Sequence, residues 1–202
     1  MPLRKTGWDT FWRTFKGTNV NVPILYLNDK PHGVNTQLMD IEIVNLFTSK
    51  AHNFFGRHGL APLDHASEEQ EEIHCVAGRG IRGDRFFQYK DDYKGQITFL
   101  ADEVFQTLCH DLKIFDKSAD VLRRNVVTRG IDLNKWIGKE FEIQGVRFKG
   151  TVECSPCYWM NHAFGPGAEE FLKGRGGLRA RILSSGSLIN SRLALKRWGS
   201  KC

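Results

Sequence analysis

Two cysteines three positions apart, Cys154 and Cys157, are the residues whose types and spacing most clearly suggest chemistry. They lie in the segment Glu153-Cys-Ser-Pro-Cys157, and a basic pair followed by an amide, Arg123-Arg-Asn125, precedes them in the chain. A thiolate attacks sulfur and binds soft metals, and nearby cations lower the pKa of a thiol. Together the two motifs predict a site for an anionic group that contains sulfur or a metal.

The cysteine pair allows several interpretations. A thioredoxin-like redox pair begins a helix in an α/β fold, whereas this pair follows an expected strand at 147–152. A structural zinc site needs two further ligands, and neither His74-Cys75 nor Cys109-His110 repeats the usual spacing. A reactive or metal-binding thiol in a basic pocket is the third interpretation. The alternative to all three is a cysteine that is only a small buried hydrophobic residue, which suits Cys75 and Cys109.

A second motif, Gly78-x-Gly80-x-x-Gly83, has the spacing of a dinucleotide-binding loop. It is followed by Asp84-Arg85-Phe86-Phe87 instead of an apolar helix, and no βαβ pattern surrounds it, so this interpretation fails. Two interpretations remain open. The segment is a basic turn that binds an anion through Arg82, Arg85 and its backbone N–H groups, or a glycine turn with solvated arginines.

The elements that would position these motifs are mostly strands. Apolar and β-branched residues predict strands near 22–27 (at a sheet edge), 41–47, 73–77, 96–100, 126–127, 141–143, 146–148 and 179–183. Gln144-Gly145 predicts a tight hairpin between two of them, and Asp102 is expected to cap a helix that runs to about residue 112. Many short strands with few helices predict a mainly β protein, a closed or nearly closed β-barrel.

The composition bounds the domain organisation and the partners. The 202 residues fit one domain with an extension, which we place as an N-terminal extension at 1–40, a barrel at 41–195 and a tail at 196–202. Trp8, Phe11, Trp12 and Phe15 form one helical face, expected to pack the extension on the barrel. The net charge of +6 favours anionic partners. An odd cysteine count, with no signal peptide or membrane-spanning run, predicts reduced thiols in a cytoplasmic protein.

Taken in order, the motifs resemble the MOSC domain, a β-barrel module found at the C-terminus of molybdenum-cofactor sulfurases and in stand-alone bacterial proteins. The resemblance covers about residues 41–195. The segments that carry it are Gly78–Phe86, Lys94–Leu100, Arg123–Leu133, Ile137–Phe141, Glu153–Cys157 and Gly177–Leu183.

The resemblance implies a reactive cysteine that binds the molybdenum of the pterin cofactor or carries sulfur as a persulfide. Pro156-Cys-Tyr-Trp-Met-Asn161 matches the family's single-thiol pattern, which selects Cys157 over Cys154. Cys154 would be a resolving thiol or merely structural. The family pattern assigns contacts with the pterin, phosphate or oxo groups to Arg123, Asn125 and Ser155. No pyridoxal-phosphate domain is recognised, so a separate cysteine desulfurase or other sulfur donor, and a recipient metal–sulfur or molybdenum enzyme, are expected partners.

Three functions therefore remain open from the sequence. The first is a carrier or binding module that holds sulfur or molybdenum cofactor at Cys157. The second is an enzyme, a molybdenum-dependent reductase of N-hydroxylated compounds with an external electron donor. The third is a basic β-barrel that binds nucleic acid, which segments such as Arg85-Phe-Phe87 permit but which leaves the cysteine pair unexplained.

Overall fold

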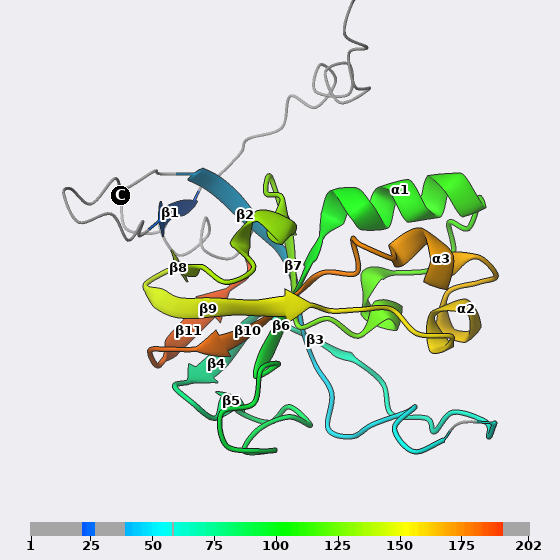
Figure 1. Ribbon diagram of the computed structural model, residues 1–202, viewed down its shortest axis with the longest axis horizontal. Coiled ribbons are helices and arrows are strands. Elements are labelled where there is room, and N and C mark those ends of the chain that lie inside the picture. Colours follow the sequence, from blue (N-terminus) through cyan, green and yellow to red (C-terminus); the bar gives the residue numbers. More distant parts are fainter. Residues whose placement is uncertain (1–21, 27–38, 58, 192–202) are drawn as a thin grey trace, which may run out of the picture.

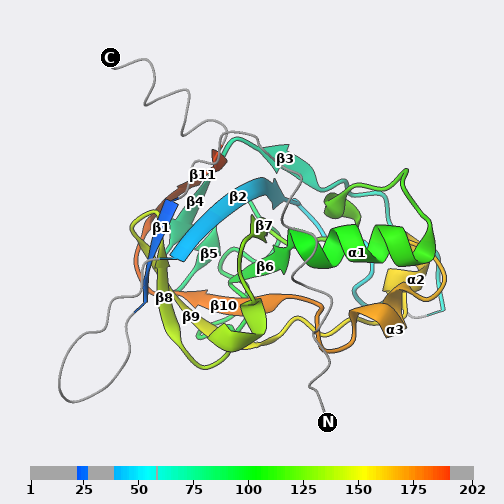
Figure 2. The same cartoon turned by 90° about the horizontal axis from the view of Figure 1, so that it is seen from above.

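The computed structural model describes residues 22–26, 39–57 and 59–191 of the chain. Figure 1 shows a strongly curved sheet, with the helices gathered at one end of it, and Figure 2 shows the same division from above. The strands are β1 (Val22–Tyr26), β2 (Met39–Thr48), β3 (Glu68–Gln70), β4 (Glu72–Val76), β5 (Gly80–Ile81), β6 (Ile97–Ala101), β7 (Val126–Arg129), β8 (Glu140–Ile143), β9 (Val146–Glu153), β10 (Leu178–Ile182) and β11 (Gly186–Ile189). The helices are α1 (Asp102–Leu112), α2 (Trp159–Ala163), α3 (Ala168–Leu172) and the 3-10 helices η2 (Ala119–Leu122) and η3 (Leu133–Trp136).

The large sheet has eight strands in the order β1-β8-β9-β10-β6-β7-β2-β3. All of its neighbours are antiparallel except β6 and β7, which run parallel because α1 and η2 form the crossover between them. A smaller sheet has the order β11-β4-β5. Strand β1 pairs with both β8 and β2, so the predicted strand near 22–27 is present, but it is paired on both sides and is not an edge.

The hairpin of β8 and β9 forms as the sequence predicts. Its turn residues Gln144 and Gly145 have positive φ values of 50° and 80°, the conformation that a two-residue hairpin turn requires. Along β9 the side chains alternate between buried and more exposed positions, so one face of the strand packs toward the interior of the curved sheet. The strand then leads directly to the cysteine pair.

Two hydrophobic clusters stabilise the molecule. The first fills the curve of the sheet, where the rings of Phe99, Phe141 and Phe148 lie edge-on or tilted at centroid distances of 5.4–5.7 Å. The second lies at the helical end and includes Leu108 of α1, Trp159 of α2 and residues of β6 and β7. The polar residues described below come from segments that meet next to this second cluster.

Helix α1 differs in detail from its prediction. Asp102 is the first residue of the helix, the N-cap position belongs to Ala101, and no side chain caps the helix. The Asp102 carboxylate instead accepts hydrogen bonds from Nε and Nη2 of Arg129 at 3.1 and 2.6 Å. A charge-assisted pair with β7 therefore replaces the expected cap, because a two-pronged guanidinium bond is stronger than a single bond to a backbone N–H.

The mainly β class with few helices is confirmed, and the large sheet curls into a half-barrel. The closure of the barrel and the domain boundaries at residues 40 and 195 stay predictions. The aromatic face of Trp8, Phe11, Trp12 and Phe15, and Cys202, lie outside the described residues. Among the helices that are described, none is long and apolar enough to span a bilayer.

Candidate functional site

The cysteine loop, which we define as residues 154–157, joins the end of β9 to α2. Its first thiol, Cys154, is buried with 5% of its surface exposed, whereas Cys157 is exposed to solvent. The Cys154 N–H donates to the carbonyl of Gly177 at 2.7 Å, and the Cys157 carbonyl accepts from the N–H of Met160 at 2.8 Å. The loop is therefore fixed at both ends and presents one thiol outward and one inward.

A glycine makes the close packing behind this loop possible. A Cβ atom on Gly176 would lie 2.4 Å from the carbonyl oxygen of Cys154, which is closer than real Cβ contacts allow. The Gly176 N–H also donates to Oε1 of Glu153 at 3.1 Å. The segment before β10 can therefore lie directly against the cysteine loop only while residue 176 lacks a side chain.

The two other described cysteines have the buried hydrophobic character that the sequence suggested. Burial raises the pKa of the Cys75 thiol to about 12, and burial followed by the charge of Asp102 raises the pKa of Cys109. Both thiols are therefore protonated and unreactive near neutral pH. Within the described residues, no group of three or more His, Cys, Asp and Glu side chains could hold a metal ion, so no zinc site forms around His74-Cys75 or Cys109-His110.

Arg85 is held in place by a carboxylate and a backbone carbonyl. Its Nη1 lies 3.4 Å from Oδ2 of Asp84, and its Nη2 donates to the carbonyl of Arg123 at 3.3 Å. Burial is the largest cause that lowers the pKa of Arg85, and the charge of Arg124 lowers it further. A negative charge on Cys154 acts in the opposite direction, which places the inward thiol within electrostatic reach of this guanidinium.

Arg123 is a second cation that the fold orients tightly. Its backbone adopts the left-handed conformation, with φ of 56°, at the end of η2. Its guanidinium donates to the hydroxyl of Ser49 at 2.7 Å and to the carbonyls of Ala51 and His65 at 2.8 Å each. Burial, followed by repulsion from Arg85, lowers the pKa of Arg123 to about 10. None of its three hydrogen-bond acceptors carries a charge.

Arg124 is a third cation that sequence reasoning assigned no role. Its side chain is buried and, within the part of the chain that the structure describes, donates only to backbone carbonyls, those of Leu122 at 2.5 Å, Gly176 at 3.0 Å and Cys154 at 3.1 Å. A guanidinium bonded to carbonyls leaves no pattern of opposite charges in the sequence. In the sequence, Arg124 could therefore be recognised only as a member of the basic pair Arg123-Arg124.

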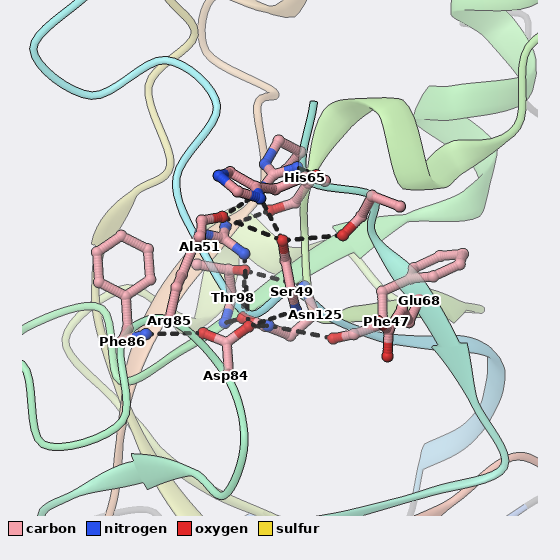
Figure 3. A network of polar contacts seen from close by, with 12 residues as sticks. Phe47, Ser49, Ala51, His65, Glu68, Asp84, Arg85, Phe86, Thr98 and Asn125 are labelled. Atoms are coloured by element: carbon pink, nitrogen blue, oxygen red, sulfur yellow. Dashed lines mark hydrogen bonds and ion pairs between the residues drawn. The ribbon is translucent and has the colours of Figure 1, made fainter. Parts of the chain in front are cut away.

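Asn125 lies at the centre of the polar network in Figure 3. Its Oδ1 accepts from the backbone N–H and the hydroxyl of Thr98 at 3.1 and 2.8 Å. Its Nδ2 donates to the Phe47 carbonyl and to Oδ2 of Asp84, both at 3.2 Å. The amide, which is 3% exposed, is thus committed to neighbouring residues. In this arrangement it orients Asp84, and through Asp84 it orients Arg85.

The electrostatic balance of this cluster favours an anion. Of the three guanidinium groups, that of Arg85 lies beside the buried carboxylate of Asp84, whereas those of Arg123 and Arg124 donate to uncharged acceptors. Partly buried cations without counter-charges cost free energy, so a bound anion would stabilise the cluster. His52 fits the same field, because burial, and then the charges of Arg85 and Arg123, lower its pKa below the ordinary value of 6.5.

A group of aromatic rings lies beside Arg85. The ring of Phe86 lies 5.0 Å from the Arg85 guanidinium carbon, 4.8 Å from the His52 ring and 5.4 Å from the Tyr89 ring. Tyr89 is 48% exposed and Phe55, whose neighbour is also His52, is 72% exposed. We call His52, Phe55, Phe86 and Tyr89 the aromatic wall. It offers flat surfaces beside a region of positive charge.

The remaining predicted residues occupy different places. Ser155 is exposed within the cysteine loop. Arg82 follows β5 and lines an open groove of roughly 410 Å³ on the small sheet, with His74, Ser185 and Ser187. A second hollow, of roughly 180 Å³, is lined by Arg123, Phe54, His65 and Ala163 among others. The structure thus joins Arg85, Arg123 and Asn125 in one network, with Cys154 within electrostatic reach of Arg85, and it places Arg82 among other residues.

Comparison with known proteins gives a family match for part of the chain. Residues 94–190 match the sequence model of the MOSC domain. Among solved structures, the YuaD protein from Bacillus subtilis is 14% identical, with a TM-score of 0.54 over 74% of this chain and 91% of that one. The YiiM protein from Geobacillus stearothermophilus is also 14% identical, with a TM-score of 0.55 over 74% and 71% of the two chains. At this identity the two likenesses show a shared fold. A search of curated proteins gave no significant match.

Proposed function

Because this chain carries a MOSC domain, we propose that it serves in metal–sulfur cofactor metabolism as a sulfur carrier, with Cys157 as the residue that accepts and passes on the sulfur. The single observation that best supports this proposal is the exposed thiol of Cys157 on a loop whose inward side faces the arginine cluster. An exposed carrier thiol is accessible to both a donor and a recipient protein. The cluster offers positive charge toward the anionic persulfide that the carrier would hold.

The transfer itself needs no oxidant. The Cys157 thiolate attacks the outer sulfur of a persulfide on a donor such as a cysteine desulfurase. A new sulfur–sulfur bond forms on Cys157, the donor's sulfur–sulfur bond breaks, and the donor cysteine leaves as a thiolate. Delivery to the recipient repeats the step in the other direction. Cys154, the inward thiol, remains a proposed resolving residue: its thiolate would attack the inner sulfur of the Cys157 persulfide, form a Cys154–Cys157 disulfide and release the outer sulfur as hydrosulfide.

The molybdenum cofactor fits the same residues in part. The soft thiolate of Cys157 suits molybdenum, and the guanidinium groups of Arg85 and Arg123 suit phosphate oxygens. Asn125 fits less well, because its amide is already bonded to Thr98, Phe47 and Asp84. When bound, the cofactor would supply redox chemistry at the metal.

This partial fit supports a second candidate function, a molybdenum-dependent reductase of N-hydroxylated compounds that takes electrons from a partner. The observation that favours it is the aromatic wall next to the arginine cluster, since exposed rings such as Phe55 and Tyr89 could stack on a planar substrate. A reductase would need permanently bound cofactor. A carrier would not.

Intact-protein and peptide mass spectrometry separate the two functions. After incubation with a cysteine desulfurase and cysteine, the wild-type chain should gain one sulfur atom on the peptide that contains Cys157. The gain should be absent from Cys157→Ser and retained in Cys109→Ser, a matched control at a buried thiol. Sulfur found elsewhere, or nowhere, contradicts the carrier. Near-stoichiometric molybdenum and pterin in purified wild type, lost in Cys157→Ser, would support the reductase instead.

A further inference from the structure

Arg124 joins three separate parts of the chain that carry the candidate site. Its Nη1 donates to Leu122 in the turn before Arg123, its Nη2 donates to Cys154 in the cysteine loop, and its Nε donates to Gly176 before β10. These partners are 2, 30 and 52 residues away in sequence. A single planar side chain therefore fixes the distance between the arginine cluster and the cysteine loop.

The contacts hold the backbone of Cys154 from both sides. Its carbonyl accepts from Arg124, and its N–H donates to the carbonyl of Gly177. The segment behind the loop also packs closely, because a Cβ atom on Gly176 would lie 2.4 Å from the Cys154 carbonyl oxygen. The loop can therefore move away from the arginine cluster only if the bonds from Arg124 break.

The same side chain contributes to the charge of the site. Arg124 is close enough for its charge to lower the pKa of Arg85, and its own guanidinium donates to the carbonyl of Cys154. Among the described residues its hydrogen bonds all go to neutral carbonyls, so no carboxylate bonded to it there cancels that charge. Arg124 therefore both holds the cysteine loop in position and contributes positive charge to the site.

We propose that Arg124 is a positioning residue that keeps the cysteine loop against Arg85 and Arg123, so that the thiol of Cys157 reacts within a positive field. The inference rests on the proposed role of Cys157 as the reactive thiol. A guanidinium is suited to this role because its rigid fork reaches several carbonyls at once. A lysine ammonium carries the same charge but cannot span the three segments.

The test compares two alkylating reagents of nearly equal size, iodoacetate and iodoacetamide, on Cys157 of the full-length protein. A positive field accelerates the anionic reagent relative to the neutral one, so the ratio of the two rates reports the field at the thiol. Unfolded protein gives the reference ratio. We expect the native wild-type ratio to exceed the reference by a factor of about 3, as for a partly screened charge near a surface.

Three variants distinguish position from charge. Arg124→Met should return the ratio to the reference. Arg124→Lys keeps the charge but breaks the carbonyl contacts, and it should also lose most of the excess. Gly176→Ala changes no charge and should displace the loop from the other side, with the same result. The matched control is Arg147→Met, which removes a cation paired with Glu140 at the opposite end of β9 and should leave the ratio unchanged.

The possible outcomes either support or overturn the inference. If Arg124→Lys keeps the wild-type ratio, Arg124 acts through its charge alone, and the proposal is overturned. If Arg124→Met keeps the wild-type ratio, Arg124 does not act on Cys157, and the proposal is overturned as well. If Arg124→Lys fails to fold, Gly176→Ala decides in its place. Because alkylation needs no sulfur donor, sulfur loading of the wild type tests the proposed function separately. Loading without the ratio effect rejects the positioning role, and the ratio effect without loading rejects the carrier.

Discussion

Arg82 and Arg85 lie three positions apart in one basic loop and meet opposite environments. Arg82 is exposed beside the groove of the small sheet, and within the described residues its guanidinium has no hydrogen-bond or ion-pair partner. The side chain of Arg85 is only 10% exposed and contacts Asp84 and the carbonyl of Arg123. The Arg82 side chain is thus exposed to solvent, whereas the Arg85 side chain is buried against protein partners.

The difference arises from the backbone between them. Strand β5 pairs with β4 and ends at Ile81, so Arg82 continues along the small sheet and donates its N–H to the carbonyl of His74. The chain then turns at Asp84, whose own N–H donates to the Ile81 carbonyl, and directs the next residue toward β2 and β7. Two arginines that look equivalent in a motif can therefore serve separate surfaces, and their replacement should have unequal costs.

The largest expected effect is on the buried side of this comparison. Asp84→Ala removes the counter-charge of Arg85 and the acceptor for the N–H groups of Ser49 and Phe86. Leaving a buried cation unpaired costs about 3–5 kcal/mol of the free energy of unfolding. Urea denaturation of the two proteins measures the difference.

A matched acid at the surface is Glu68, whose Oε1 lies 3.2 Å from Nζ of Lys50. Glu68→Ala should change the free energy of unfolding by less than about 0.5 kcal/mol, since exposed ion pairs contribute little. Equal losses of unfolding free energy in the two variants would show that the Asp84 network stabilises the protein no more than an exposed ion pair does.

Much of the fold could be predicted because local patterns determine it. Alternating apolar residues located the strands, and Gln144-Gly145 located a hairpin turn that requires positive φ values. The parallel pair of β6 and β7 left no such local signal, since its partners are separated by a whole crossover. The same is true of the bond between Asp102 and Arg129, which replaces the expected helix cap.

A pH dependence of stability is expected at His52, whose pKa responds to burial and to the charges of Arg85 and Arg123. The folded protein lowers the pKa of His52 below its ordinary value of 6.5, first by burial and then by Arg85 and Arg123. Below about pH 6.5 the unfolded chain therefore binds this proton more readily than the folded protein, and stability falls as the pH decreases. Above that pH both states are neutral at His52 and no contribution remains.

His52→Phe keeps an aromatic ring beside Phe55 and Phe86 but cannot be protonated. We expect it to lose less of its free energy of unfolding than wild type between pH 7 and pH 5, by a fraction of 1 kcal/mol because His52 is only partly buried. Guanidinium denaturation of both proteins at the two pH values gives the change in unfolding free energy for each. The contributions of the other titrating groups cancel when the two changes are subtracted. A greater loss in the variant would contradict the lowered pKa.

The candidate site was less predictable than the fold, for a physical reason. The sequence identified the cysteine loop, Arg123 and Asn125, but not that the Asn125 amide is used up by Thr98, Phe47 and Asp84. The sequence also did not single out Arg124, because a residue of any type can supply the backbone carbonyl that accepts its hydrogen bond. Such contacts depend on where distant segments meet, and only the folded structure contains that information.

The smallest expected effect sharpens the comparison most directly. Arg82→Ala removes a solvated cation and should change the free energy of unfolding by less than about 0.5 kcal/mol. If Arg82 and Arg85 serve different surfaces, the variant should also load sulfur at the wild-type rate, whereas Arg85→Ala should load more slowly because it weakens the field near Cys154. Mass spectrometry of both variants after timed incubation with the desulfurase measures the two rates. Equal slowing in the two variants would mean that both arginines act on one anion, and that the groove on the small sheet belongs to the same functional surface as the cysteine loop.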